Sequence, residues 1–169
     1  MQVFLVRLLA TLYVVTGLVF TPVCLADEPR TLAVIVSNQP AFAVASQLGA
    51  QELSLIYWRK KQFWGGGVRI HPVNLQAEDP LRIYFSKTVL GSTPGEQSSY
   101  WNELYFQGTT PPYSVQSEEA VLRYVTSTKG AIGYVDACSL DRRVKAMLWI
   151  ANDKIMTAAP EKFNCPNMP

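Results

Sequence analysis

The residue types best suited to chemistry in this sequence are one histidine, His71, and three cysteines, Cys24, Cys138 and Cys165. A thiol paired with a histidine base can act as a nucleophile, and clusters of such side chains can bind a metal ion. His71 and Cys138 are far apart in the chain, and no second histidine accompanies them. A secreted thiol or metal enzyme would depend on these two residues alone. We expect no enzymatic activity, no metal site and no cofactor, and we interpret His71 as a hydrogen-bonded strand residue.

Two short motifs could also carry chemistry. Glu78-Asp79 could serve as an acid–base pair or bind a cation, and Gly65-Gly66-Gly67 could form a phosphate-binding loop. No Lys-Ser or Lys-Thr pair follows the glycines, and the two acids directly precede Pro80. This context favours a turn at the glycines and a helix-capping role for the acids.

Residues 1–26 predict a cleaved signal peptide. Of these residues 19 are apolar, Arg7 carries the one charge, and small residues stand at Cys24 and Ala26. The uncharged stretch 8–20 is shorter than the ~20 residues that a membrane anchor needs. A lipoprotein signal with Cys24 as its modified residue is the less favoured alternative. We expect cleavage after Ala26, a periplasmic location and no membrane-spanning segment in the processed protein.

Export changes the interpretation of the cysteines. If Cys24 leaves with the signal peptide, Cys138 and Cys165 remain as an even pair in an oxidising compartment. A disulfide between them would close a loop of 27 residues and stabilise the fold by roughly 3–4 kcal/mol in the chain-entropy model. We therefore predict this disulfide as a tether for the C-terminal tail, residues 151–169, with a reactive Cys138 thiol as the alternative.

Composition bounds the number of domains and the kind of partner. The chain has 169 residues, of which 49% are hydrophobic and 17% charged. This is enough for one hydrophobic core and argues against both a disordered chain and a large multidomain enzyme. The net charge of +2 is far from the basic excess typical of nucleic-acid binding, so we expect no nucleic-acid partner. Residues 27–150 are predicted to form one α/β domain.

Hydrophobic patterning predicts elements in the order βαβααβαββ. Thr31–Ser37 is a continuous, mostly β-branched run, typical of a strand buried on both faces. Asp79-Pro80 combines a capping residue with a proline at the first helical position. The other expected elements are a helix over 52–61, a strand over 68–75, a helix ending at Gly91, a helix over 94–106, an extended segment after Pro112, a helix over 117–126, and strands over 131–135 and 144–150. This order predicts a mixed sheet flanked by helices.

Three of these elements carry more specific expectations. Pro72 should place the strand 68–75 at a sheet edge or near a strand end. Arg59–Lys61 should lie in the last helical turn of 52–61, as a solvated end or as part of a positive partner surface. Tyr100 and Trp101 should belong to an aromatic stripe that packs into the core.

Several phrases together carry a family resemblance. They are ELSLIY at 52–57 with Trp64-Gly65, DPLR at 79–82 with VLG at 89–91, Tyr100-Trp101 with FQG at 106–108, and GAIGYV at 130–135. In this order they resemble the periplasmic phosphate-binding-protein-like family, the substrate-binding proteins of phosphate ABC transporters, in a short single-lobe form. The resemblance covers residues 32–148. It implies a single three-layer α/β lobe, a secreted solute-binding role and coupling to an ABC importer.

The resemblance also suggests where a ligand would bind. An oxyanion site needs backbone N–H groups, hydroxyl donors and an arginine that converge on one point. Candidates at strand ends and helix starts are Ser37, Asn38, Arg82, Gln107, Gly108 and Thr109. The ordinary alternative for Arg82 is a surface salt bridge to Glu78 or Asp79.

The sequence departs from the family at residues 76–80, which read Gln-Ala-Glu-Asp-Pro where phosphate-binding members have a Ser-Gly-Thr-type turn. Asp79 as a cap would occupy backbone donors, Pro80 has no N–H, and Glu78 adds negative charge. We therefore predict a solute-binding-like protein with an altered or degenerate oxyanion site, whose partners are a small oxyanion or other small solute and an ABC importer. The alternative is an envelope accessory or adaptor protein that uses the lobe for protein–protein interaction.

Overall fold

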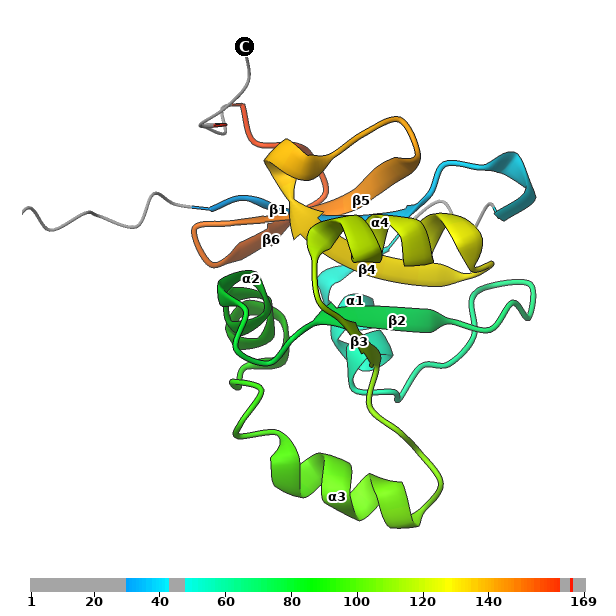
Figure 1. The fold of residues 1–169 in the computed structure, drawn as a ribbon, viewed down its shortest axis with the longest axis vertical. Helices are drawn as coiled ribbons and strands as arrows, with labels where there is room; N and C mark the ends of the chain where they lie inside the picture. The colour runs from blue at the N-terminus through cyan, green and yellow to red at the C-terminus, as the bar shows by residue number, and fades with distance from the viewer. Residues whose placement is uncertain (1–29, 43–47, 162–164, 166–169) are drawn as a thin grey trace, which may run out of the picture.

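The structure is a computed structural model that describes residues 30–42, 48–161 and 165. The predicted signal peptide, residues 1–26, lies outside the described residues. Six strands form one open, mixed sheet in the order β3-β2-β4-β1-β5-β6, with helices packed against it (Figure 1). The expected α/β class is confirmed. No helix in the described residues is both long enough and apolar enough to cross a membrane.

The elements follow the predicted order with one strand added at the end. The strands are β1 (Leu32–Ser37), β2 (His71–Leu75), β3 (Tyr113–Val115), β4 (Ala131–Asp136), β5 (Val144–Ala151) and β6 (Lys154–Met156). The α-helices are α1 (Ala50–Tyr57), α2 (Pro80–Phe85), α3 (Ser98–Phe106) and α4 (Glu118–Ser127). Three short helical segments are η1 (Pro40–Phe42), η2 (Ser86–Leu90) and η3 (Ala137–Ser139), of which η2 continues α2 as a π-helix.

Strand β1 lies in the interior of the sheet and buries all six of its side chains. It pairs antiparallel with β4 on one side and with β5 on the other. Both faces of a strand in this position must be covered, which explains its unbroken apolar sequence. The expectation of a strand buried on both faces is confirmed.

Helices cover both faces of the sheet and make three layers (Figure 1). Helix α4 packs on one face so closely that a Cβ atom at Gly133 of β4 would lie 2.6 Å from Val121 Cγ1 of the helix. On the opposite face, Tyr57 of α1 donates a hydrogen bond from its hydroxyl to the carbonyl oxygen of Val73, at 3.1 Å. The predicted three-layer lobe is therefore present.

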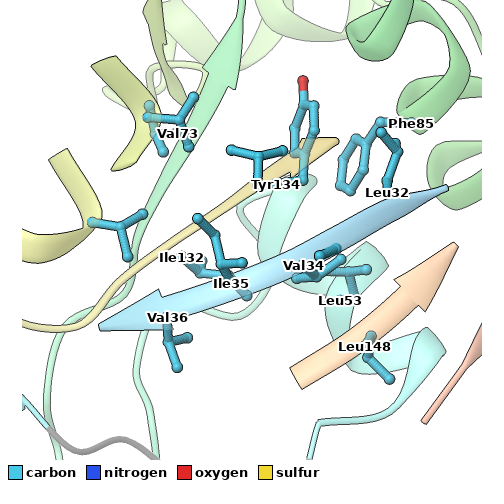
Figure 2. Close-up of a cluster of buried hydrophobic side chains, with 14 of the residues drawn as sticks. Leu32, Val34, Ile35, Val36, Leu53, Val73, Phe85, Ile132, Tyr134 and Leu148 are labelled. Carbon is cyan, nitrogen blue, oxygen red and sulfur yellow. The ribbon is translucent and has the colours of Figure 1, made fainter. Parts of the chain in front are cut away.

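An aromatic stack links α1, α2 and β4 inside the core. The rings of Phe85 and Tyr134 are nearly parallel, with centroids 3.9 Å apart and an interplanar angle of 6°. The ring of Tyr57 lies 4.6 Å from that of Phe85. Figure 2 shows Phe85 and Tyr134 among the aliphatic side chains of β1 and its neighbours. Aromatic side chains bury large areas, so this stack fixes α2 against the carboxyl end of β4.

The start of α2 follows the prediction. The carboxylate of Asp79 accepts a hydrogen bond from the backbone N–H of Leu81 at 2.8 Å, and Pro80 is the first helical residue. The helical segment ends at Gly91, whose φ of 69° lies in the left-handed region. Both ends were therefore encoded locally, by a capping side chain and a glycine.

Helix α1 ends earlier than predicted. It stops at Tyr57, and Arg59 adopts a left-handed backbone with a φ of 61°. The N–H groups of Lys60 and Lys61 both donate to the carbonyl oxygen of Leu55, which closes the helix. The expectation that Arg59–Lys61 form the last helical turn is wrong, because the chain turns at Arg59 despite the cost of this conformation for a residue with a Cβ atom.

Strand β2 is shorter and more buried than predicted. It starts at His71, because residues 62–70 fold back on themselves with Ile70 N–H donating to the carbonyl oxygen of Gln62. Pro72 is the second residue of β2, so the expectation of a strand end holds. The strand lies between β3 and β4 rather than at an edge, and from Pro72 to Leu75 every side chain is buried.

Helix α3 differs most from the prediction. It begins at Ser98 rather than at residue 94, and none of its residues is buried. Tyr100 and Trp101 do contact Trp58, with ring centroids 4.6 and 6.0 Å from it. The expectation of a core stripe is wrong, because these rings form a partly exposed cluster on a helix that stands away from the sheet (Figure 1).

The C-terminal region contributes one strand that the sequence analysis missed. Asn152 and Asp153 both have positive φ, 50° and 57°, and form the two-residue turn between β5 and β6. Asparagine and aspartate tolerate such angles, so the Asn-Asp pair was the available signal. Cys138 and Cys165 form a disulfide, as the sequence predicted.

The contact between Gly133 and α4 predicts a large effect for a small substitution. In Gly133→Ala the new methyl group would also lie 2.9 Å from Val73 Cγ1, so we expect a loss of about 1–3 kcal/mol in the free energy of unfolding. Urea denaturation measures it. Gly95→Ala is the matched control, because its methyl group would meet no atom within 4 Å. Equal stability of the two variants would contradict the close packing described here.

Candidate functional site

The predicted ligand residue Arg82 lies in α2, directly after the carboxyl end of β2. The turn before it, residues 76–78, is exposed, whereas Arg82 itself is only 7% exposed. The parallel strands β2 and β4 end beside each other here. In open α/β sheets, ligands bind at the carboxyl ends of such strands.

Arg82 is a buried cation that lacks an acidic partner. In the described part of the chain no ion pair involves Arg82, and its buried Nη1 atom has no hydrogen-bond partner. The expectation of a surface salt bridge to Glu78 or Asp79 is therefore wrong. One helical turn further, the buried hydroxyl of Ser86 also has no partner. Buried donors of this kind are rare and call for an explanation.

Two buried tyrosines, Tyr57 and Tyr134, lie close enough to Arg82 to interact with its charge. The Tyr134 hydroxyl accepts a hydrogen bond from Leu75 N–H at 3.3 Å and donates one to Asn74 Oδ1 at 3.4 Å. Burial raises the pKa of Tyr134 to about 12, although the positive charge of Arg82 acts in the opposite direction. Burial likewise raises the pKa of Tyr57 well above its usual value. Both phenols are therefore neutral at physiological pH and leave the charge of Arg82 uncompensated.

The turn before α2 offers few donors to an anion. Asp79 accepts from Leu81 N–H, Pro80 has no N–H, and Ile83 N–H donates to the carbonyl oxygen of Asp79. The capping role expected for Asp79 is confirmed. This turn therefore does not offer an anion a row of free backbone N–H groups.

Ser37 and Asn38 lie at the opposite end of the sheet. Because β1 is antiparallel to β4, its last residues pair near Ile132 while Leu32 pairs with Asp136. The N–H of Asn38 donates to the carbonyl oxygen of Arg143 at 3.0 Å, and its side-chain amide donates to that of Arg142 at 3.2 Å. Asn38 borders a cavity of about 480 Å³ together with Arg142 and Arg143, and its backbone N–H and its side-chain amide each already donate one hydrogen bond.

Gln107, Gly108 and Thr109 form the end of helix α3. Their three N–H groups donate to the carbonyl oxygens of Leu104 and Tyr105, at distances of 2.9–3.0 Å. They therefore close the helix and are not free to bind an oxyanion. The structure does not bring the six candidate residues together at one point. Arg82 is the one among them with a buried side-chain donor atom that has no hydrogen-bond partner.

Sequence reasoning missed Tyr134 and Asn74. Tyr134 stands in the middle of a buried strand, where its hydroxyl must find a polar partner, and Asn74 occupies the matching position of β2. A polar residue inside each of two apolar strands was the available signal. In the described residues no three His, Cys, Asp or Glu side chains lie close enough together to hold a metal ion.

Comparison with solved structures shows that this fold resembles those of phosphate-binding proteins. An ABC-type phosphate transport receptor from Vibrio cholerae matches with a TM-score of 0.54 and 19% identity over 70% of this chain and 46% of its own. A protein assigned as a phosphate ABC transporter substrate-binding protein, with bound phosphate, from Clostridium perfringens has a TM-score of 0.56 and 21% identity, over 70% and 44% of the two chains. The resemblance inferred from the sequence is thus confirmed for the fold.

The chain spans less than half the length of these structures. A phosphate-binding candidate from Planctomyces limnophilus shows the same relation, with a TM-score of 0.51, 16% identity and coverage of 70% of this chain and 41% of its own. The described residues therefore correspond to a short form of the fold. No family model matches the sequence, and no curated protein matches it.

The cap of α2 leads to a stability prediction. Asp79→Ala removes the acceptor for Leu81 N–H and should lower the free energy of unfolding by about 1 kcal/mol. Asp79→Ser keeps a capping oxygen and should restore most of that loss. Urea denaturation of the two variants and the parent protein measures both. A serine variant as unstable as the alanine variant would show that the carboxylate acts by its charge and not as a cap.

Proposed function

We propose that this protein is an exported, periplasmic solute-binding-like protein that binds a small oxyanion through Arg82, at a site altered from that of phosphate-binding relatives. Its fold, which resembles that of phosphate ABC transporter substrate-binding proteins, supports the general role. An ABC importer is then its natural partner. The observation that carries the proposal is the buried Nη1 atom of Arg82, which has no partner.

The energetics of Arg82 support a binding role. A buried charge without a counter-charge destabilises a protein, and replacing such groups by apolar side chains is often stabilising. No residue in the described part of the chain offsets the cost of Arg82 by an ion pair. An oxyanion would supply the missing negative charge and the missing hydrogen-bond acceptor.

Arg82→Met separates binding from stability. Without ligand, the variant should be more stable than the parent by about 1 kcal/mol, or about 3 °C in Tm, because it removes an unpaired buried cation. A thermal-shift panel of phosphate, sulfate, molybdate and small organic anions should raise the Tm of the parent through binding to the native state. The three inorganic oxyanions should leave the Tm of Arg82→Met unchanged, while Arg142→Gln, an exposed arginine elsewhere, should respond to them like the parent.

Asp79→Ser tests the alteration of the site. The carboxylate of Asp79 acts electrostatically on Tyr134, which contacts Arg82, so its negative charge opposes an anion bound there. Removing that charge while keeping the cap should enlarge the Tm shift caused by phosphate. A Tm shift with phosphate, sulfate or molybdate that survives in Arg82→Met would refute the assignment of Arg82.

Helix α3 favours a second candidate function, that of an envelope adaptor. It has no buried residue, and the side chains of Tyr105 and Phe106 are 66% and 88% exposed. Exposed aromatic side chains beside one another are typical of protein–protein contact sites.

If no anion raises the Tm of the parent protein, the adaptor function of this helix is the one to test. The double variant Tyr105→Ser, Phe106→Ser should then lose the envelope protein that cross-links to the parent protein in intact cells. Phe63→Ser, at a residue that is 52% exposed outside α3, is the matched control and should keep the cross-link. If both variants keep the cross-link, α3 is excluded as the contact site.

A further inference from the structure

A second cavity lies at the other end of β2, away from Arg82. It has a volume of about 350 Å³ and is lined by Arg59, His71, Pro111, Pro112, Tyr113 and Tyr124, among others. His71 is the first residue of β2, whereas Arg82 follows its last residue. The two places are therefore separated by the length of the strand. We propose that this cavity binds a small aromatic carboxylate.

The positive charge of the cavity is not balanced from within the protein. The charged side chains that act on Arg59 and His71 are cationic: Arg69 acts on both, and Arg59 acts on His71. Burial and these like charges lower the pKa of Arg59 and of His71. No carboxylate of the described residues forms an ion pair with either group. An anion from outside the chain would supply the opposite charge.

Arg59 is held in place and has donor capacity left. Its backbone adopts the left-handed conformation, which sets the direction of the Cα–Cβ bond. Its Nη1 atom donates a long hydrogen bond to the carbonyl oxygen of Ile70 at 3.4 Å. Its buried Nε atom has no partner. A guanidinium presents pairs of parallel N–H groups that match the two oxygens of a carboxylate.

The remaining walls suit a flat apolar body. The rings of Tyr113 and Tyr124 stack with centroids 5.4 Å apart and an interplanar angle of 29°, although Tyr113 is 60% exposed. Pro111 and Pro112 add apolar surface beside them. The ring of Tyr113 is held by its stacking on Tyr124 but keeps an exposed surface against which one more ring can pack. Charge on one wall and flat apolar surface on another together select a carboxylate attached to a ring.

Benzoate is the probe for this site. A titration followed by ¹H–¹⁵N NMR should show saturable shifts around Arg59 and Tyr113 with a Kd of about 1 mM or tighter. Acetate has the charge without the ring, benzyl alcohol has the ring without the charge, and inorganic phosphate has a different anionic group. Each of these should bind at least tenfold more weakly. Equal shifts with acetate or phosphate would mean a simple anion site, and equal shifts with benzyl alcohol an apolar one, and either would overturn the proposal.

Variants assign the binding to the cavity. Arg59→Gln should weaken benzoate binding roughly tenfold by removing the charge. Tyr113→Ala changes an exposed side chain, so it should fold normally and still weaken binding several-fold. Arg142→Gln, in the other cavity, and Arg82→Met should bind benzoate like the parent, which keeps this result independent of the proposed oxyanion function. Undiminished binding by a folded Arg59→Gln would refute the assignment.

His71 provides a readout that a structural effect would not change. It is the one histidine of the chain, so its ring resonance is unambiguous. The groups that face it are Arg59, Arg69 and the phenols of Tyr113 and Tyr124. A carboxylate bound among them favours the imidazolium form, so benzoate should raise the pKa of His71. A pKa that stays unchanged at saturating benzoate would place the ligand elsewhere.

Discussion

The complete burial of β1 is the constraint on which the rest of the structure depends. Its six side chains are all inaccessible, and hydrogen-bonded strands flank it on both sides. Such a strand is stable only if other elements cover both faces of the sheet. Helix α4 covers one face through the close contact at Gly133, and α1 and α2 cover the other through Tyr57 and Phe85. The three layers follow from this requirement.

The direction of β1 then decides which residues can act together. As an antiparallel neighbour of β4, it ends where β2 and β4 begin. Ser37 and Asn38 are thus carried to one end of the sheet, while Arg82 stands at the other. The same arrangement brings His71 near Arg59 and the Tyr113–Tyr124 pair. One sheet therefore presents two separate cationic regions, one at each end of β2.

The two regions differ in how the cation is held. Arg82 is almost fully buried beside neutral phenols, so its charge is costly and an anion there gains from a low-dielectric surrounding. Arg59 is only partly buried and borders an open cavity with aromatic walls. Shape complementarity and apolar contact therefore contribute more to ligand binding there than at Arg82. The α/β fold supports both, since function in such folds depends on the particular site and not on the architecture.

The sequence by itself determined the features that depend on neighbouring residues. The apolar run of β1, the Asp79-Pro80 start of α2, the position of helix α4 and the order of elements were all predicted from local patterns, and the phrases of the family resemblance indicated the fold. Local chemistry specifies such features because a cap or a buried run acts over a few residues.

Only the tertiary structure decided which residues share a site. The antiparallel course of β1, the exposure of α3, the turn at Arg59 and the burial of Arg82 beside Tyr134 depend on pairings between residues far apart in the chain. A single sequence contains no direct signal for such pairings. Packing of the sheet and its two covering layers selects them, and the same packing determines which polar groups remain without a partner.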